Sequence, residues 1–347
     1  MLYATTRSNS HVETTHRAIH FDRCSDGGFF VPFRLPQLER EQILQMKDHS
    51  FSDNVASVLN MFFSCNLTGW DVEFAIGRNA LKTSCIPHRI FLAEAWHCAE
   101  NRFSYIVKSL FQRFSVAEIG NVPTNWVQIA VRIAAIFGAY GMLLAQGQVD
   151  VRVPLDVAVA TGDFSTVMAT WYARQMGLPL GNIICGCNAN GAIWDLLHRG
   201  IMSTSAVSVN TNTPLSDIVI PDNLERLIDR TLGKDAVNAY LENRCTGQLY
   251  SLEKEELEKL RSGMFASVIS DSRVNQMIHS VFRANNYILS PYDALAYGSL
   301  LDYRAKSGES RPAMIFSERS PVCDYEMVAK NMNVGVEEVL RRVSIGE

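Results

Sequence analysis

The stretch Asp156-Val157-Ala158-Val159-Ala160-Thr161-Gly162-Asp163-Phe164 is a run of small apolar residues that ends in a polar turn. A short, continuous apolar run before a glycine is typical of a strand that is buried on both faces. A helical pattern follows as far as Met176, and Gly177-Leu178-Pro179 ends it. The stretch therefore predicts a strand, a turn and a helix in succession.

The same order of elements recurs in the next residues. Asn182-Ile183-Ile184-Cys185-Gly186-Cys187 predicts a second buried strand, and a helical stretch follows Asn188-Ala189-Asn190-Gly191. Alternating strands and helices indicate an α/β fold with a parallel sheet flanked by helices. Other predicted elements are a short strand before Pro32, a late strand over 313–316, and helices over 39–46, 53–63, 251–260 and 270–282.

Composition excludes several classes of protein. The 347 residues are 47% hydrophobic and 20% charged with a net charge of −4, so we expect up to two folded domains and no nucleic-acid partner. The eight cysteines lack the paired spacing of a zinc site, so we predict no metal and reduced thiols. The first residues, Met1 to Arg7, lack the apolar run of a secretory signal. These features favour a cytoplasmic protein.

One segment, Val127 to Ala145, has the length and apolarity of a membrane span. It carries Gln128 and Arg132, and an arginine near the middle of a span costs about 2.5–3.5 kcal/mol on insertion scales. We therefore predict a helix buried inside an α/β protein, and no membrane partner.

Several motifs resemble those of the threonine synthase family in order and rough spacing. Tyr3 to Arg7 and Asp26 to Pro32 resemble its N-terminal motifs, and 157–164 resembles its strand ending in Ser-Gly-Asn-Phe-Gly. Shorter matches follow at 125–126, 176–179, 187–190, 223–227, 270–271 and 287–291. The chain is identified as a shortened and degenerate member of this family, which implies the fold type II of pyridoxal phosphate enzymes, similar to tryptophan synthase β.

The resemblance implies a chemistry that the residues do not support. The family converts O-phosphohomoserine to threonine and phosphate, and a lysine in its Phe-Lys-Asp-Phe segment holds pyridoxal phosphate as a Schiff base. The corresponding stretch here runs from Trp96 to Tyr105 and places Ser104 at the lysine position. A hydroxyl cannot form the imine. Lys108, one helical turn further on, is a weak substitute, and the alternative is an ordinary surface lysine.

Two further departures concern the cofactor's phosphate and ring. The family binds the phosphate through the backbone N–H groups of a Ser-Gly-Asp-Thr-Gly loop. Here Gly120 is the one glycine between Phe103 and Asn125, so this loop is missing from the segment. Bulky residues around Tyr292 and over 317–321 stand where the family has small ones beside the cofactor ring. The resemblance thus implies a fold type II large domain with a reduced cofactor domain.

The resemblance also implies three segments. Residues 1–88 would form an N-terminal threonine synthase-like helical extension. Residues 89–150 would be a remnant of the cofactor domain with a connecting helix, and residues 151–347 the large α/β domain.

Ligands in open α/β sheets gather beyond the carboxyl ends of the strands. The predicted ligand- or anion-binding residues are accordingly Thr161, Gly162, Asp163, Phe164, Ser165 and Asn188. An inherited turn that caps a helix is the alternative interpretation. Arg132 and Arg152 are candidates for contacting a phosphate-bearing ligand, or else ordinary ion-pair partners.

The hypothesis that follows is a threonine synthase-like protein without pyridoxal phosphate catalysis and with no cofactor. It would bind a small anionic amino-acid-like ligand, or act as a regulatory partner of another protein. The alternative is an active threonine synthase that uses pyridoxal phosphate, with a site completed by another subunit. Self-association into a homo-oligomer stays open, as does a third class, an enzyme with cofactor-independent chemistry.

Overall fold

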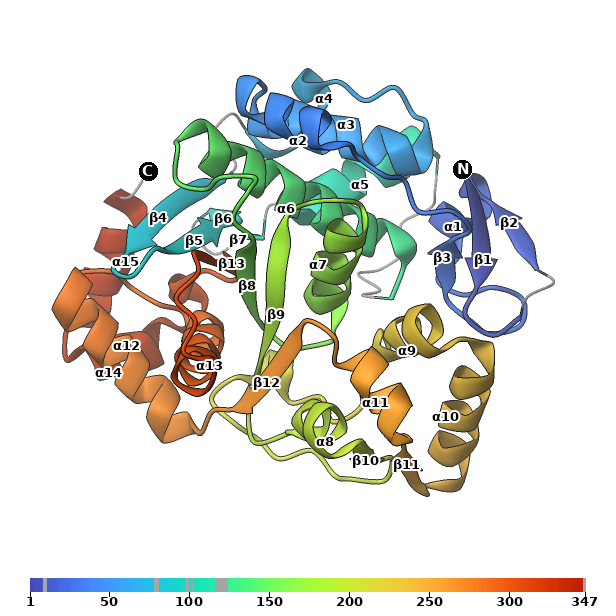
Figure 1. Ribbon diagram of the computed structural model, residues 1–347. Coiled ribbons are helices and arrows are strands. Elements are labelled where there is room, and N and C mark those ends of the chain that lie inside the picture. The colour runs from blue at the N-terminus through green and yellow to red at the C-terminus, as the bar shows by residue number, and fades with distance from the viewer. Residues whose placement is uncertain (9–10, 78–80, 98–99, 102, 116–123, 346–347) are drawn as a thin grey trace.

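The computed structural model describes residues 1–8, 11–77, 81–97, 100–101, 103–115 and 124–345. Its centre is a six-stranded sheet (Figure 1). Across the sheet the order is β12 (Met264–Val268), β9 (Leu180–Cys187), β8 (Leu155–Ala160), β13 (Ala313–Ser317), β5 (Ile90–Glu94) and β4 (Lys82–Ile86). Neighbours pair in parallel except β4, which is antiparallel to β5 at one edge. The predicted α/β fold with a parallel sheet flanked by helices is confirmed.

The central strands are buried on both faces. In β8, Val157 and Val159 point into one hydrophobic core, while Ala158 points into a second core on the other side of the sheet. Successive strand residues point to opposite faces, so a strand between two cores needs apolar residues at every position. This explains the continuous apolar run over 157–160.

Helices α6 (Trp126–Ala145) and α7 (Ser165–Gln175) pack together on the first face, and α3 (Phe51–Phe63) packs against α6 (Figure 1). Helix α6 is long and apolar enough to cross a membrane, yet 83% of its apolar window is buried in the protein. Gly138 of α6 lies against the ring of Phe51, where a Cβ would come within 2.6 Å of a ring carbon. The prediction of a core helix is confirmed.

Helix α13 (Pro291–Ser307) covers the second face and crosses β8 and β9. Helix α12 (Asp271–Asn285) packs beside it, and α14 (Tyr325–Met332) and α15 (Val336–Ile345) complete this layer (Figure 1). The N-terminus of α13 therefore lies close to the carboxyl ends of the central strands.

The N-terminal residues form a separate three-stranded sheet in the order β2 (Val12–Thr14), β1 (Leu2–Thr5), β3 (Phe30–Pro32), with α1 (Thr15–His20) beside it. The strand before Pro32 is the predicted one, and β1 and β2 were not predicted, because they are short and lack alternating apolar residues. Helices α2 (Arg40–Gln45) and α3 match the helices expected over 39–46 and 53–63, and α4 (Gly69–Ile76) follows them.

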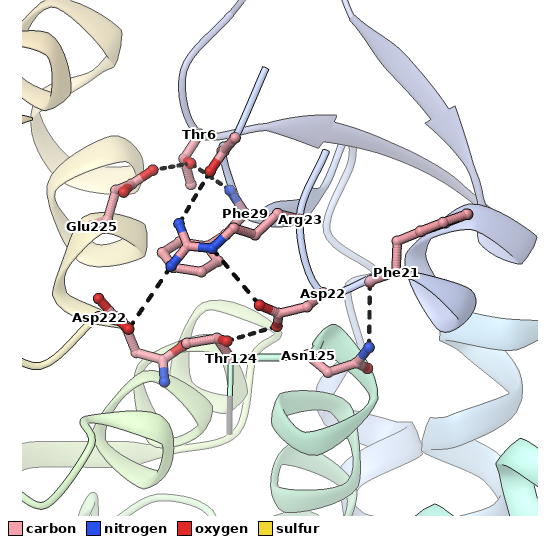
Figure 2. Close-up of polar contacts among 12 residues, drawn as sticks. Thr6, Phe21, Asp22, Arg23, Phe29, Thr124, Asn125, Asp222 and Glu225 are labelled. Carbon is pink, nitrogen blue, oxygen red and sulfur yellow. Dashed lines mark hydrogen bonds and ion pairs between the residues drawn. The ribbon is translucent and has the colours of Figure 1, made fainter. Parts of the chain in front are cut away.

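Polar contacts join this small sheet to the rest of the protein (Figure 2). The hydroxyl of Thr6 donates to the buried carboxylate of Glu225 in α9 (Leu224–Leu232). The hydroxyl of Thr124 donates to Asp22 over 2.6 Å, and Arg23 lies 3.7 Å from Asp22. Segments far apart in the sequence are thus held together just before α6 begins.

The remaining elements include two that the sequence predicted, α8 (Ala192–Arg199) and α11 (Lys254–Leu260). The others are α5 (Phe103–Arg113), α10 (Lys234–Thr246) and the short strands β6 (Trp96–His97), β7 (Glu100–Asn101), β10 (Ile201–Ser203) and β11 (Leu249–Ser251). The proposed limits at 88/89 and 150/151 stay a prediction. Residues 1–88 are not purely helical, since β4 joins β5 in the central sheet.

Candidate functional site

The turn after β8 is built by its own local contacts. The N–H of Phe164 donates to the carbonyl of Thr161 over 2.8 Å, and Asp163 accepts the N–H of Ser165, the first residue of α7, over 2.9 Å. Gly162 has a φ of +45° and Phe164 a φ of +69°, and burial of the Phe164 ring holds this left-handed backbone in place. The predicted turn therefore exists, and Asp163 satisfies one free amide of the helix.

A cavity of about 430 Å³ opens beside this turn, at the carboxyl ends of β8 and β13. The first turns of α7 and α13, the side of α6 and the loop over 215–218 complete its wall. The side chains that matter below are Gln128, Arg132, Thr166, Tyr292, Asp293, Phe316, Glu318 and Arg319. Its volume is in the range of cavities that bind small organic ligands.

The structure brings three of the six predicted site residues into this wall: Thr161, Gly162 and Asp163. Phe164 and Ser165 are fully buried and are not part of the lining. Ser165 instead accepts a hydrogen bond from Asn223 over 3.0 Å.

Asn188 is also buried outside the lining. Its amide donates to the hydroxyls of Thr211 and Thr213 over 2.9 and 3.0 Å and to Asp217 over 2.7 Å. These contacts order the loop that carries Leu215, which does line the cavity. Asn188 therefore shapes the wall through the loop.

A carboxylate of the protein lies at the first turn of α7. The two Glu318 carboxylate oxygens lie 2.8 Å from Arg132 Nε and 2.5 Å from Thr166 Oγ1. Negative charge near a helix N-terminus is stabilised by the helix dipole. Glu318 thus supplies an internal anion at the place where the sequence predicted an external one.

The other arginine of the wall is held in a similar way. Arg319 pairs with Asp324 over 2.8 Å, and its guanidinium lies 5.5 Å from the ring centre of Tyr292. Arg152 lies outside the lining, 74% exposed in its side chain and paired with Asp150. Of the two arginines considered for an anionic ligand, the structure places Arg132 at the cavity.

Asp293 is the buried carboxylate of the wall. It accepts the hydroxyl of Ser317 over 2.9 Å, and that hydroxyl in turn accepts the indole N–H of Trp96 over 2.9 Å. Burial, with a smaller contribution from the nearby carboxylate of Glu94, raises the pKa of Asp293 to about 6. The side chain can therefore gain or lose a proton near neutral pH.

This shift predicts a pH-dependent stability. The folded protein holds the Asp293 proton more tightly than the unfolded chain, so this stabilisation is complete below about pH 4 and is lost as the pH rises through about 6. The Asp293→Asn variant has no carboxyl group at this position and therefore does not titrate there. The wild-type minus variant difference in free energy of unfolding should therefore fall between about pH 4 and pH 7, measured by urea denaturation. Glu94 and Tyr287 face the same region and are present in both proteins, so parallel pH profiles would contradict the shift.

Helix α5 carries Ser104, the position at which the sequence comparison expects a lysine, and Lys108. Ser104, at the expected lysine position, lies in its first turn, where neighbouring Phe103 stacks on Phe316 of the cavity wall with ring centres 5.6 Å apart. Lys108 is exposed, and its Nζ lies 5.7 Å from the ring centre of Tyr105. No lysine occurs among the described residues that line the cavity. Gly120 lies outside the described residues.

The described part of the chain holds no group of three potential metal ligands. Cys185 and Cys187 are free, fully buried thiols in β9, and burial raises the pKa of Cys187 to about 12. They pack in the core as ordinary apolar residues.

Comparison with known proteins gives a consistent picture. Residues 2–78 match the family model described as the threonine synthase N terminus. Threonine synthase-like 1 of Homo sapiens is 30% identical over 194 residues, which are 54% of this chain and 26% of that protein. Threonine synthase-like 2 of Rattus norvegicus is 27% identical over 187 residues, 53% of this chain and 38% of that protein.

The chain is similar to the threonine synthase N terminus over residues 2–78 and to threonine synthase-like proteins over about half of its length. It spans well under half the length of these curated relatives. Solved threonine synthases share the fold: the yeast enzyme aligns with a TM-score of 0.84 at 16% identity, over 99% of this chain and 94% of that one. The pyridoxal phosphate-bound enzyme of Brucella melitensis aligns with a TM-score of 0.82 at 17% identity, over 99% of both chains. The predicted fold type II architecture is confirmed.

Two residues of the wall were missed in the sequence. Thr166 follows the predicted turn directly, but its contact with Glu318 joins residues 152 positions apart. Asp293 follows Ser290 by three positions, a spacing that indicates a helix cap and carries no sign of burial in a cavity.

Proposed function

We propose that this protein binds a small anionic amino-acid-like ligand in the 430 Å³ cavity and does not catalyse pyridoxal phosphate chemistry. The observation that carries the proposal is the make-up of the wall. The cofactor needs an amine to hold it as an imine, and the described lining residues include none. The wall therefore does not fit the cofactor, and we derive no step through it.

The charges of the wall support an ionic ligand of modest size. Arg132 and Arg319 supply positive charge, and Asp163, Asp293 and Glu318 supply negative charge. Mixed charges around a small cavity suit a molecule that carries both signs, as amino acids do. A regulatory role toward a protein partner would depend on the same ligand. The composition predicts that the protein works in the cytoplasm.

The alternative is an active threonine synthase. It is favoured by the shared fold with the pyridoxal phosphate-bound enzyme of Brucella melitensis. Under this alternative an amine must come from Lys108 after a rearrangement of α5, or from another subunit.

Incubation of the purified protein with pyridoxal phosphate and then borohydride separates the two. We expect no covalent adduct by intact-mass spectrometry and no phosphate release from O-phospho-L-homoserine above background. We also expect O-phospho-L-homoserine to raise the melting temperature, since a ligand at about 100 times its Kd adds about 2.7 kcal/mol of stability.

The variant Lys108→Ala serves as the control for a displaced lysine. An adduct that forms in the wild type and disappears in this variant would establish the alternative and end the proposal. An adduct in both proteins would place the reactive amine elsewhere in the chain and end it equally. A melting temperature unchanged by O-phospho-L-homoserine would contradict the ligand-binding part.

A further inference from the structure

Asp293 is a buried carboxylate that lines the cavity, and the residue is 3% exposed. The Ser290 N–H, over 3.2 Å, and the Ser317 hydroxyl, over 2.9 Å, donate to its Oδ2. The Ser290 side chain is a further hydrogen-bond partner of the carboxylate. Among the described residues, no cation forms an ion pair with it. The carboxylate therefore has neutral hydrogen-bond donors and no charged partner.

Helix capping alone does not account for this placement. Asp293 and Asp53 are both third residues of helices with capping boxes, and their contacts have the same lengths. Ser290 N–H to Asp293 and Ser50 N–H to Asp53 both measure 3.2 Å, and the return bonds both measure 3.1 Å. Asp53 makes these contacts while exposed to solvent. A capping box therefore does not require its aspartate to be buried, and the burial of Asp293 needs another explanation.

A carboxylate that loses its water without gaining a cation is destabilising. The arginines of the wall do not relieve Asp293, because Arg132 pairs with Glu318 and Arg319 with Asp324. An ammonium group entering the cavity would give the Asp293 carboxylate a charged hydrogen-bond donor and would offset the cost of burial.

We propose that the Asp293 carboxylate binds the ammonium group of an amino-acid ligand, and that this contact makes the cavity selective for amines over their hydroxyl analogues. The inference rests on the proposed function, which it deepens by naming the recognised group.

The test compares two probes by calorimetry: O-phospho-L-homoserine and its 2-hydroxy analogue, which carries a hydroxyl in place of the ammonium group. Wild type should bind the amine at least tenfold more tightly, as expected for a hydrogen bond to a charged group. Asp293→Asn keeps an acceptor for Ser317 and Ser290, and it should weaken the amine about tenfold to a hundredfold while changing the analogue less than about threefold. Asp53→Asn, the matched capping-box variant, should bind both probes as the wild type does.

The outcomes separate this inference from the function on which it rests. If wild type binds both probes equally, the cavity binds a ligand but Asp293 does not select the amine, and the inference is overturned. An equal loss for both probes in Asp293→Asn would also overturn it. Binding of neither probe by wild type would overturn the proposed function and the inference together. The wild-type comparison of the two probes decides the matter even if Asp293→Asn fails to fold.

Discussion

Replacing Arg226 with methionine is expected to lower the free energy of unfolding by about 3–5 kcal/mol, the largest effect of any single change considered. The Arg226 side chain is fully buried and lies over the ring of Phe29, with 4.7 Å between the guanidinium carbon and the ring centre. It donates to the carbonyls of Phe30 over 3.2 Å and Thr124 over 2.7 Å, and to the side chain of Asn223. Methionine would fill the space but leave these acceptors without donors.

The effect should be large because these acceptors belong to three separate parts of the chain. Phe30 begins β3, Thr124 precedes α6, and Asn223 is the N-cap of α9. Arg226 contacts Phe29 and Thr124, and both of these residues take part in the junction that Figure 2 shows. Without it, the N-terminal sheet should detach before the central sheet unfolds, and early hydrogen exchange confined to residues 2–32 would report this.

The control is Arg199→Met, which removes an arginine that is 60% exposed and paired with Asp195 within α8. Exposed ion pairs contribute about 0–1 kcal/mol, so this variant should melt close to the wild type. Arg226→Lys keeps the charge but cannot reach all the acceptors, and it should fall between the two. Equal stability of Arg226→Met and Arg199→Met in urea denaturation would show that the junction does not depend on this side chain.

Replacing Gly186 with alanine should cost about 3 kcal/mol, the upper end of the cost of overpacking a core. Gly186 lies in β9, where α13 crosses the sheet. A Cβ at this position would lie 2.7 Å from the carbonyl oxygen of Leu295 and 3.0 Å from the amide nitrogen of Ala296. Both are backbone atoms of a helix, so no side-chain rotation can relieve the contact, and α13 must shift.

A shift of α13 would move Asp293 in its first turn, so Gly186→Ala should also weaken ligand binding at the cavity. Gly335→Ala is the matched control, because a Cβ there meets no atom within 4 Å and the backbone is not left-handed. We expect it to unfold within about 0.5 kcal/mol of the wild type. If the Gly186→Ala and Gly335→Ala variants had the same free energy of unfolding, α13 would have to lie further from β9 than the structure places it.

Local sequence patterns were enough to predict three of the six strands of the central sheet, β8, β9 and β13. The apolar runs over 157–160 and 183–187 predicted β8 and β9, because a strand buried on both faces has no polar positions. The order of strand and helix then indicated a parallel sheet, and Arg132 within an apolar helix indicated burial in the protein. Short strands such as β1 and β2 were missed, since their stability comes from partners distant in sequence.

The location of the candidate site could be predicted from the sequence, but the set of residues that line it could not. The turn over 161–163 could be located because a strand, a glycine and a helix are adjacent in sequence, and the structure places these residues at the cavity. Phe164 and Ser165 share the turn but face inward, since the backbone reverses direction within it. Asn188 was placed at the sheet edge correctly, yet its contacts with Thr211, Thr213 and Asp217 depend on how a later loop folds back.

The sequence alone therefore determined the strands β8 and β9 with the helices that follow them, the buried helix α6 and the absence of a lysine at position 104, because each is a local property of residue type and spacing. Only the tertiary structure decided that Glu318 lies against Thr166 and Arg132, and that Asp293 is a buried carboxylate in a cavity wall. The reason is physical: burial and charge pairing depend on which distant segments the sheet brings together, and residue spacing carries no record of that.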